Sequence, residues 1–111
     1  ALETLFLQSL RAINDYFGLG YKIYYWRTLA GQEVDFVMYG PRGLLAFEIK
    51  RNANITSKML RPLQSFGTDY PEAKLYIIHL GHQKEYHESI TALPFEEALQ
   101  DLPNILQQNS Q

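Results

Sequence analysis

The stretch EVDFVMYGPRGLLAFEIK, residues 33–50, decides the fold of this chain. It contains two strand-like segments with Gly40-Pro41-Arg42-Gly43 between them, a composition typical of a tight turn. Residues two apart in a strand point to the same face, so Asp35 can converge with Glu48 and Lys50. Two carboxylates beside one ammonium can bind a hard divalent cation and hold a water next to it. These three side chains are the minimum that metal-dependent phosphodiester hydrolysis requires.

Strict alternation gives each of these two strands one wholly apolar face for the core. The apolar faces carry Val34, Phe36 and Met38 on the first strand and Leu45, Phe47 and Ile49 on the second. Asp35 lies in mid-strand, where acids are depleted, and its repulsion of Glu48 is costly unless a cation or Lys50 compensates. The alternative is a solvent-facing sheet surface with an ordinary Glu48–Lys50 pair, because single acid-x-lysine triplets are common.

Apolar spacing elsewhere predicts helices and strands on both sides of this unit. We expect a helix over about 2–17, a first strand over 21–28, and second and third strands over 33–39 and 44–50. A polar loop over 52–57 precedes a second helix with Met59, Leu60, Leu63 and Phe66 as its buried stripe. Pro62 leaves the start of that helix open, because proline is tolerated in a first turn and disruptive further in.

The C-terminal third predicts a fourth strand over 74–80 that is apolar on both faces and therefore central or parallel. A short edge strand over 85–92 and a terminal helix over 95–108, broken at Pro103, follow. We expect the polar tail 107–111 to be frayed. The order is α-β-β-β-α-β with a C-terminal addition, and no linker divides the chain into two domains.

Composition sets limits on the class of protein. The 111 residues suffice for one domain with one core, and 46% hydrophobic and 14% aromatic residues argue against disorder. No apolar run approaches the roughly 20 residues that span a bilayer, and there is no signal peptide pattern. The absence of cysteine excludes disulfides and fits a cytoplasmic protein. Ala1 already lies inside the helical pattern, so we interpret the chain as a piece of a longer protein.

The net charge of -2 does not suggest generic nucleic-acid binding, but one segment is basic. Lys50, Arg51, Lys58 and Arg61 follow Glu48 closely, where a phosphate backbone would have to lie beside the two acids. A solvated helix surface explains the same pattern and is the better explanation on charge alone.

Two further residues are candidates for the same site. Glu3 borders the apolar stripe of the first helix and could reach the sheet, although acids are also favoured near a helix N-terminus. Gln64 on the second helix could contact phosphate or a metal-bound water, but most such glutamines are surface residues. The three histidines, His79, His82 and His87, match no standard zinc spacing.

With these residues placed, the chain resembles the PD-(D/E)XK nuclease-like superfamily. Asp35 matches the acid of the second strand, Glu48-Ile49-Lys50 matches the (Asp/Glu)-x-Lys triplet, and Glu3 matches an acid of the first helix. Val34 stands where the family's leading proline would be. The resemblance implies an α/β, restriction-endonuclease-like core in which helices flank a mixed central sheet.

A closer resemblance covers nearly the whole chain. Residues 24–52 (YYWRTLAGQEVDFVMYGPRGLLAFEIKRN) and 60–71 (LRPLQSFGTDYP) look like the C-terminal domain of unknown function of many prokaryotic AAA-type ATPases. This implies that residues 1–111 are a single nuclease-like domain and that an N-terminal ATPase module of the same chain is its partner.

Two functions follow from these resemblances. In the first, the domain is a deoxyribonuclease in which Asp35 and Glu48, with Glu3 and the carbonyl of Ile49, hold Mg²⁺ or Mn²⁺. Lys50 would then orient the attacking water, and the phosphate backbone would be held by Arg51, Lys58, Arg61 and Gln64. In the alternative, the domain is a non-catalytic module that binds nucleic acid or a partner. The sequence leaves the oligomeric state open, a homo-oligomer included.

Overall fold

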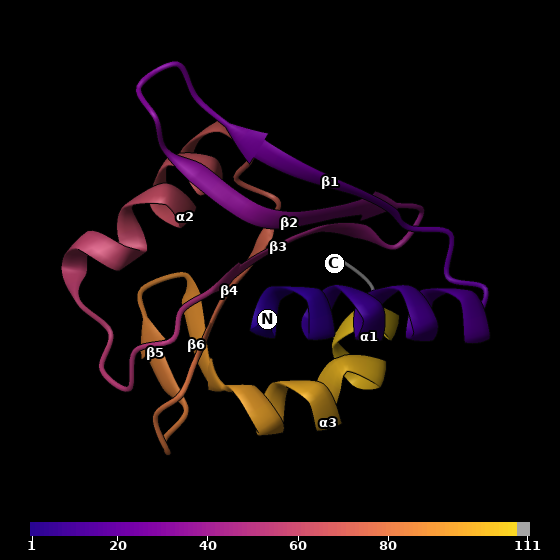
Figure 1. Cartoon of the computed structure of the whole chain (residues 1–111). Coiled ribbons are helices and arrows are strands. Elements are labelled where there is room, and N and C mark those ends of the chain that lie inside the picture. Colours follow the sequence, from indigo (N-terminus) through magenta and orange to yellow (C-terminus); the bar gives the residue numbers. More distant parts are fainter. Residues whose placement is uncertain (109–111) are drawn as a thin grey trace.

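Six strands form one mixed sheet with helices on both sides in the computed structural model, which describes residues 1–108 (Figure 1). The elements are α1 (Leu2–Tyr16), β1 (Lys22–Arg27), β2 (Glu33–Gly40), β3 (Gly43–Ile49), α2 (Ser57–Asp69), β4 (Lys74–His79), β5 (Glu85–His87), β6 (Ile90–Pro94) and α3 (Phe95–Gln107). The predicted α/β class and the order α-β-β-β-α-β are confirmed. Within the described residues, no helix is both long and apolar enough to cross a membrane.

The strand order in the sheet is β1-β2-β3-β4-β6-β5. β1, β2 and β3 form the predicted antiparallel meander, whereas β4 runs parallel to both β3 and β6. The fourth strand therefore lies inside the sheet and pairs in parallel, as its two apolar faces predicted. β5 closes the far edge antiparallel to β6.

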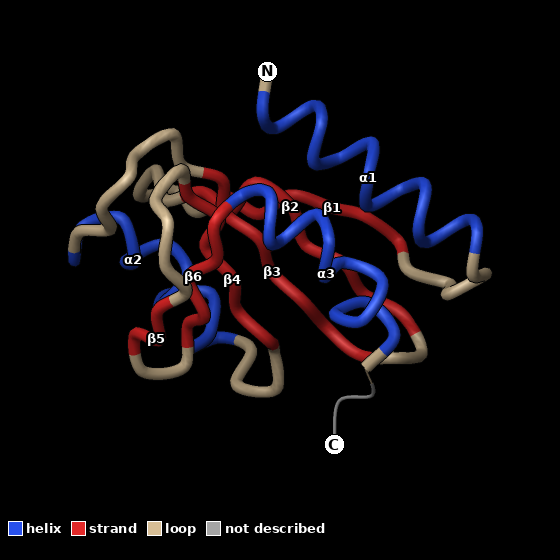
Figure 2. Tube along the Cα trace, turned by 90° about the horizontal axis from the view of Figure 1, so that it is seen from below, coloured by secondary structure: helices blue, strands red, loops and turns tan. Residues whose placement is uncertain are grey.

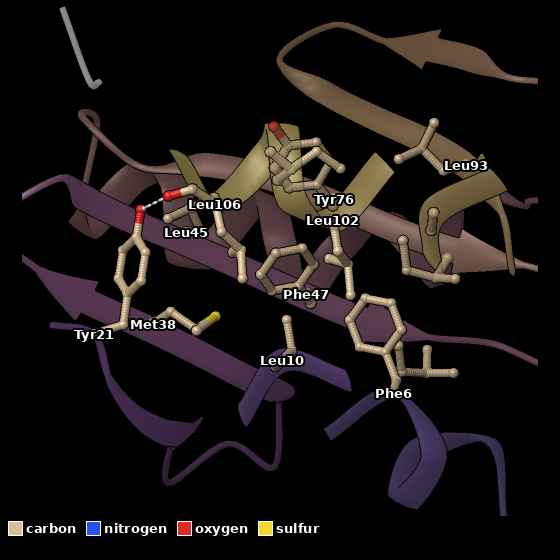
Figure 3. Close-up of a cluster of buried hydrophobic side chains, with 14 of the residues drawn as sticks. Phe6, Leu10, Tyr21, Met38, Leu45, Phe47, Tyr76, Leu93, Leu102 and Leu106 are labelled. Carbon is tan, nitrogen blue, oxygen red and sulfur yellow. Dashed lines mark hydrogen bonds between the residues drawn. The ribbon is translucent and has the colours of Figure 1, made fainter. Parts of the chain in front are cut away.

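The helices cover both faces of the sheet and create two apolar layers (Figures 1 and 2). On one side α1 and α3 pack on the sheet, and the rings of Phe6, Phe47 and Tyr76 meet there (Figure 3). The ring centroids of Phe6 and Phe47 are 5.4 Å apart, and those of Phe47 and Tyr76 are 5.3 Å apart. On the other side α2 packs Leu63 and Phe66 against the sheet. β3 is consequently buried on both faces.

Two helices contain a proline and continue past it. α2 begins at Ser57, where the hydroxyl of Thr56 accepts a hydrogen bond from the amide of Met59 over 3.4 Å. α3 is continuous from Phe95 to Gln107, so the predicted break at Pro103 is wrong. The buried residues of α3 lie on both sides of this proline, and their packing outweighs the cost of roughly 3 kcal/mol for an interior proline. These residues are Phe95, Ala98, Leu102, Ile105 and Leu106.

The predicted single edge strand over 85–92 is also wrong. The segment is a hairpin in which β5 turns back through Glu88 and Ser89 into β6. Glu88 has a φ of 56°, a left-handed conformation that the turn requires and that the sequence, with no glycine there, does not signal. The predicted fraying of 107–111 falls largely on residues 109–111, which lie outside the described residues.

β2 departs from strict alternation next to Asp35. Tyr24 pairs with Val37 and Trp26 pairs with Val34, so β2 has one residue more than β1 over this interval. Val34 and Val37 therefore pack in the same layer, on the α2 side of the sheet. The prediction that Val34 shares a face with Phe36 and Met38 is wrong, because a bulge shifts the side-chain alternation by one residue.

Candidate functional site

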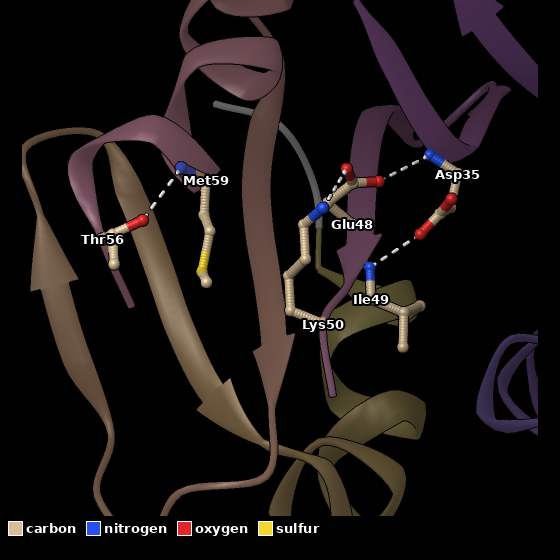
Figure 4. Close-up of polar contacts among 6 residues, drawn as sticks. All are labelled: Asp35, Glu48, Ile49, Lys50, Thr56 and Met59. Carbon is tan, nitrogen blue, oxygen red and sulfur yellow. Dashed lines mark hydrogen bonds and ion pairs between the residues drawn. The ribbon is translucent and has the colours of Figure 1, made fainter. Parts of the chain in front are cut away.

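The site lies where the ladder between β2 and β3 ends. Cα pairing of the two strands reaches Phe36 and Phe47, and the next two residues interact through side chains instead. The amide of Asp35 donates a hydrogen bond to Oε1 of Glu48 over 3.0 Å, and the amide of Ile49 donates to Oδ2 of Asp35 over 2.8 Å (Figure 4). Each carboxylate is thus held by the backbone of the opposite strand, which brings the two predicted acids together.

Glu48 is the only acidic residue that is buried among those described, with 5% of its surface exposed. Burial raises the pKa of Glu48 to about 8, and the charge of Asp35 and its hydrogen bond add to the effect. The Lys50 ammonium, 3.6 Å from Oε2 of Glu48, and the Asp35 amide lower this pKa only in part. Glu48 therefore retains its proton to a higher pH than an exposed glutamate, because the Lys50 ammonium alone does not offset the burial of its carboxyl.

A cleft of about 330 Å³ opens beside Glu48 and Lys50. Its remaining walls come from the first half of α2 and from the turn before β2. They are formed by Gly31, Gln32, Glu33, Lys58, Arg61 and Pro62. The cleft therefore combines the buried acid with three cationic side chains, of which Lys50 is the one in contact with Glu48 and has 34% of its side chain exposed.

Three of the predicted site residues do not join this cluster. Oε1 of Glu3 lies 4.0 Å from Nη2 of Arg51, and neither residue lines the cleft. Gln64 lies at a separate cleft that His87 and Ser89 of the β5–β6 hairpin also line. Within residues 1–108 no three acids or histidines are placed to hold one metal ion, so Glu3 does not complete a three-carboxylate site.

The histidines have other surroundings. His79 is 3% exposed at the end of β4, and its Nδ1 accepts a hydrogen bond from the amide of Gly81 over 2.9 Å. Nε2 of His87 lies 3.0 Å from Oε1 of Glu85 on the edge strand. Burial of His79 lowers its pKa and favours the neutral imidazole, and among the described residues no histidine belongs to a group of three potential metal ligands.

Sequence reasoning missed two residues that line the cleft, Gln32 in the turn between β1 and β2 and Glu33 at the first position of β2. Oε1 of Glu33 lies 2.6 Å from Nη2 of Arg27, its partner in the β1–β2 ladder. Their position just before Asp35 in the sequence was the available signal.

The donors of the site suit a hard cation. The carboxylates of Asp35 and Glu48 and the carbonyl of Ile49 are oxygen ligands of the kind that Mg²⁺ and Mn²⁺ prefer. One oxygen of each carboxylate is engaged by a backbone amide, which orients the group, and the second oxygen of Glu48 lies 3.6 Å from the Lys50 ammonium. A cation bound beside Glu48 would favour the ionised form of this buried carboxyl, which the Lys50 ammonium alone does not.

Comparison with known protein families gives one result. Residues 1–98 match the family described as a domain of unknown function (DUF4143), and the chain belongs to that family. Neither a curated protein nor a solved structure matches the chain.

Proposed function

We propose that this DUF4143 domain is a metal-dependent phosphodiesterase that acts on DNA. The observation that carries the proposal is the buried carboxyl of Glu48, linked to the half-buried Asp35 through the Asp35 amide, beside a cleft that Lys50 and two further cationic side chains line. A buried acid destabilises the fold when it ionises without a counter-charge. A divalent cation in contact with both carboxylates and with a bound phosphate would compensate that charge.

The residues that would hold Mg²⁺ or Mn²⁺ are Asp35, Glu48 and, through its carbonyl, Ile49. When bound, the ion would lower the pKa of a coordinated water and neutralise charge on the scissile phosphate. The amides of Asp35 and Ile49 keep the two carboxylates oriented from opposite strands. This orientation is built into the backbone and does not depend on flexible side-chain partners.

Lys50 is the residue that faces substrate. Its ammonium lies 3.6 Å from Glu48 and is one-third exposed to the cleft, so it can contact both a phosphate oxygen and a water near the carboxylates. Lys58 and Arg61 on α2 line the same cleft and supply charge for the neighbouring phosphates. The preference for DNA over RNA rests on the resemblance to PD-(D/E)XK nucleases.

The test is cleavage of linear, circular and single-stranded DNA by this chain with Mg²⁺ or Mn²⁺. We expect Lys50→Ala and Glu48→Gln to lose cleavage while their circular dichroism spectra remain those of the wild type. Lys84→Ala removes an exposed lysine at the opposite edge of the sheet and serves as the matched control. Equal cleavage by the wild type and by Glu48→Gln would contradict the proposal, because the activity would then come from elsewhere.

A second candidate function is a binding module without catalysis, attached to the ATPase module expected on the same chain. The specific observation is that both acids already accept hydrogen bonds from backbone amides, and burial raises the pKa of Glu48 to about 8, which favours its uncharged form. A pair of this kind can simply secure the ends of β2 and β3. DNA binding that requires Lys58 and Arg61 but neither metal nor Glu48 would favour this module over the enzyme.

A further inference from the structure

A second cleft, of about 350 Å³, lies along β1, β2 and the C-terminal half of α2 and does not include the carboxylate pair. Aromatic rings dominate its walls. The ring of Trp26 meets Phe66 edge-on with centroids 5.4 Å apart, and Phe66 meets Tyr70 at 4.8 Å. Because these rings are packed against each other, the walls of the cleft are preformed.

The charge of this cleft is negative. Glu72 is exposed and is the only charged residue among those that line it, whereas the cationic side chains line the carboxylate cleft. Aromatic faces carry partial negative charge and attract ammonium and guanidinium groups. A phosphate or a carboxylate would be repelled by Glu72, so the cleft favours a cationic group.

The cleft adjoins an open strand edge. β1 is hydrogen-bonded to β2 alone and forms one border of the sheet (Figure 1), whereas the opposite border, β5, has three residues. β1 contains no proline, and its central residues Tyr24 and Tyr25 are 51% and 76% exposed. An unprotected edge of this length is a template for a further strand.

A second copy of the chain is a poor occupant of this edge. A centred antiparallel pairing of β1 with its own copy would place Lys22 opposite Arg27 of the copy at both ends, and like charges directly opposite are destabilising. The occupant that fits the edge and the cleft together is therefore a different chain that brings its own cation.

We propose that β1 and the aromatic cleft bind an extended segment of a partner polypeptide by strand addition, with an arginine or lysine side chain in the cleft beside Glu72. The backbone of the segment pairs with β1, and its cation lies on the rings of Trp26, Tyr24 and Tyr70. This interaction surface is independent of the carboxylate pair and of any phosphodiesterase activity.

Trp26 is the only tryptophan of the chain and lines the cleft, so its fluorescence reports occupancy directly. The probe is acetyl-Thr-Val-Arg-Val-Thr-amide, titrated in parallel with the same peptide in which neutral citrulline replaces arginine. We expect a saturable fluorescence change with the arginine peptide and an affinity roughly three- to thirtyfold lower for the citrulline peptide. An arginine peptide with N-methylated backbone amides is expected to bind more weakly, because it cannot pair with β1.

Glu72→Gln is expected to lower the affinity for the arginine peptide several-fold and to leave the affinity for the citrulline peptide unchanged. Glu96→Gln, an exposed acid on α3, makes the same change in net charge away from the cleft and is the matched control. Equal affinities for arginine and citrulline peptides would overturn the cationic assignment, as would tighter binding of an oligothymidine. Undiminished affinity of the N-methylated peptide would overturn strand addition, and no saturable change at millimolar peptide would overturn the proposal as a whole.

Discussion

Asp35 and Glu48 are joined across two strands through the backbone: the Asp35 amide donates to Glu48 Oε1 over 3.0 Å, at the point where the regular β2–β3 ladder has ended. In the reverse direction, the Asp35 carboxylate accepts a hydrogen bond of 2.8 Å from the amide of Ile49, the residue after Glu48 on β3. The pair therefore both closes the strand ends and becomes doubly negative once Glu48 ionises. Closure of the strand ends is compatible with a protonated Glu48, whereas metal binding requires Glu48 to lose its proton.

The free energy of unfolding should fall as pH rises from about 4.5 to about 8. The folded chain holds a proton on Glu48 up to about pH 8, whereas the unfolded chain releases it near the ordinary value of 4.5. Between these values the folded state binds more protons, so each pH unit removes up to about 1.4 kcal/mol of stability from this group. Urea denaturation at a series of pH values measures the slope.

Glu48→Gln should flatten that slope, because the amide cannot ionise. Glu72→Gln changes the same formal charge at an exposed position and should leave the slope as it is in the wild type. A slope that persists in Glu48→Gln would assign the titration to another group.

The apparent affinity for Mg²⁺ and Mn²⁺ should increase by nearly tenfold per pH unit below about pH 8 and level off above it. The proton on Glu48 competes with the metal and must leave when the metal binds. Calorimetry in buffers with different ionisation enthalpies would measure the released proton. Metal binding that is independent of pH over this range would show that Glu48 is not a ligand.

Asp35→Asn and Asp35→Ala should differ in stability. The asparagine keeps a side-chain oxygen for the Ile49 amide, while its loss of charge lowers the pKa of Glu48 and abolishes cleavage. The alanine leaves the Ile49 amide without its acceptor, which costs about 1–3 kcal/mol. Equal stabilities of the two variants would mean that this hydrogen bond contributes little to the strand closure.

Tyr21→Phe should destabilise the fold by about 1–2 kcal/mol. The Tyr21 hydroxyl donates a buried hydrogen bond of 2.7 Å to the carbonyl of Leu106, which joins the start of the meander to the end of α3 (Figure 3). Tyr25→Phe removes a hydroxyl from a side chain that is 76% exposed and is the control. Thermal denaturation of both variants should show a lower midpoint for Tyr21→Phe alone.

Gly81→Ala should be strongly destabilising, whereas Gly67→Ala should be mild. A Cβ on Gly81 would lie 2.3 Å from the carbonyl oxygen of Ala53, so the loops after β3 and β4 would have to separate. A Cβ on Gly67 would meet only a methyl group of Leu75 at 2.8 Å, and alanine favours the helix by about 1 kcal/mol. Denaturation midpoints of the two variants test this contrast.

The sequence predicted which residues share a face of the sheet wherever the alternation of apolar and polar residues matches the alternation of buried faces. The shared face of Glu48, at the end of β3, and Lys50, the residue just after β3, was predicted correctly, because both line the cleft on the α2 side of the sheet. The position of Asp35 was predicted for the wrong reason, because alternation is interrupted there. The bulge in β2 depends on pairing with β1, and no residue of β2 marks it.

The continuity of α3 and the surroundings of Glu3 and Gln64 depend on tertiary contacts, which local sequence patterns do not reveal. Pro103 predicts a helix end, but the packed residues on both sides of it hold α3 together. Glu3 was predicted to join the acids from its helix position and from the family resemblance, and Gln64 was predicted to contact phosphate or a metal-bound water from its helix position. Where each helix lies over the sheet depends on contacts distant in sequence, and these direct Glu3 to Arg51 and Gln64 to the β5–β6 hairpin.

The bonds that close β2 onto β3 have a consequence for local dynamics. Since carboxylate oxygens take the place of backbone carbonyls, the amide protons of Asp35 and Ile49 are only as protected as those carboxylates are stationary. Hydrogen–deuterium exchange at these two amides should therefore speed up when the side chains rotate toward a ligand and slow down when they return. Opening of this end of the β2–β3 pair is therefore controlled by two side chains, whereas the other strand pairs of the sheet are held by backbone hydrogen bonds.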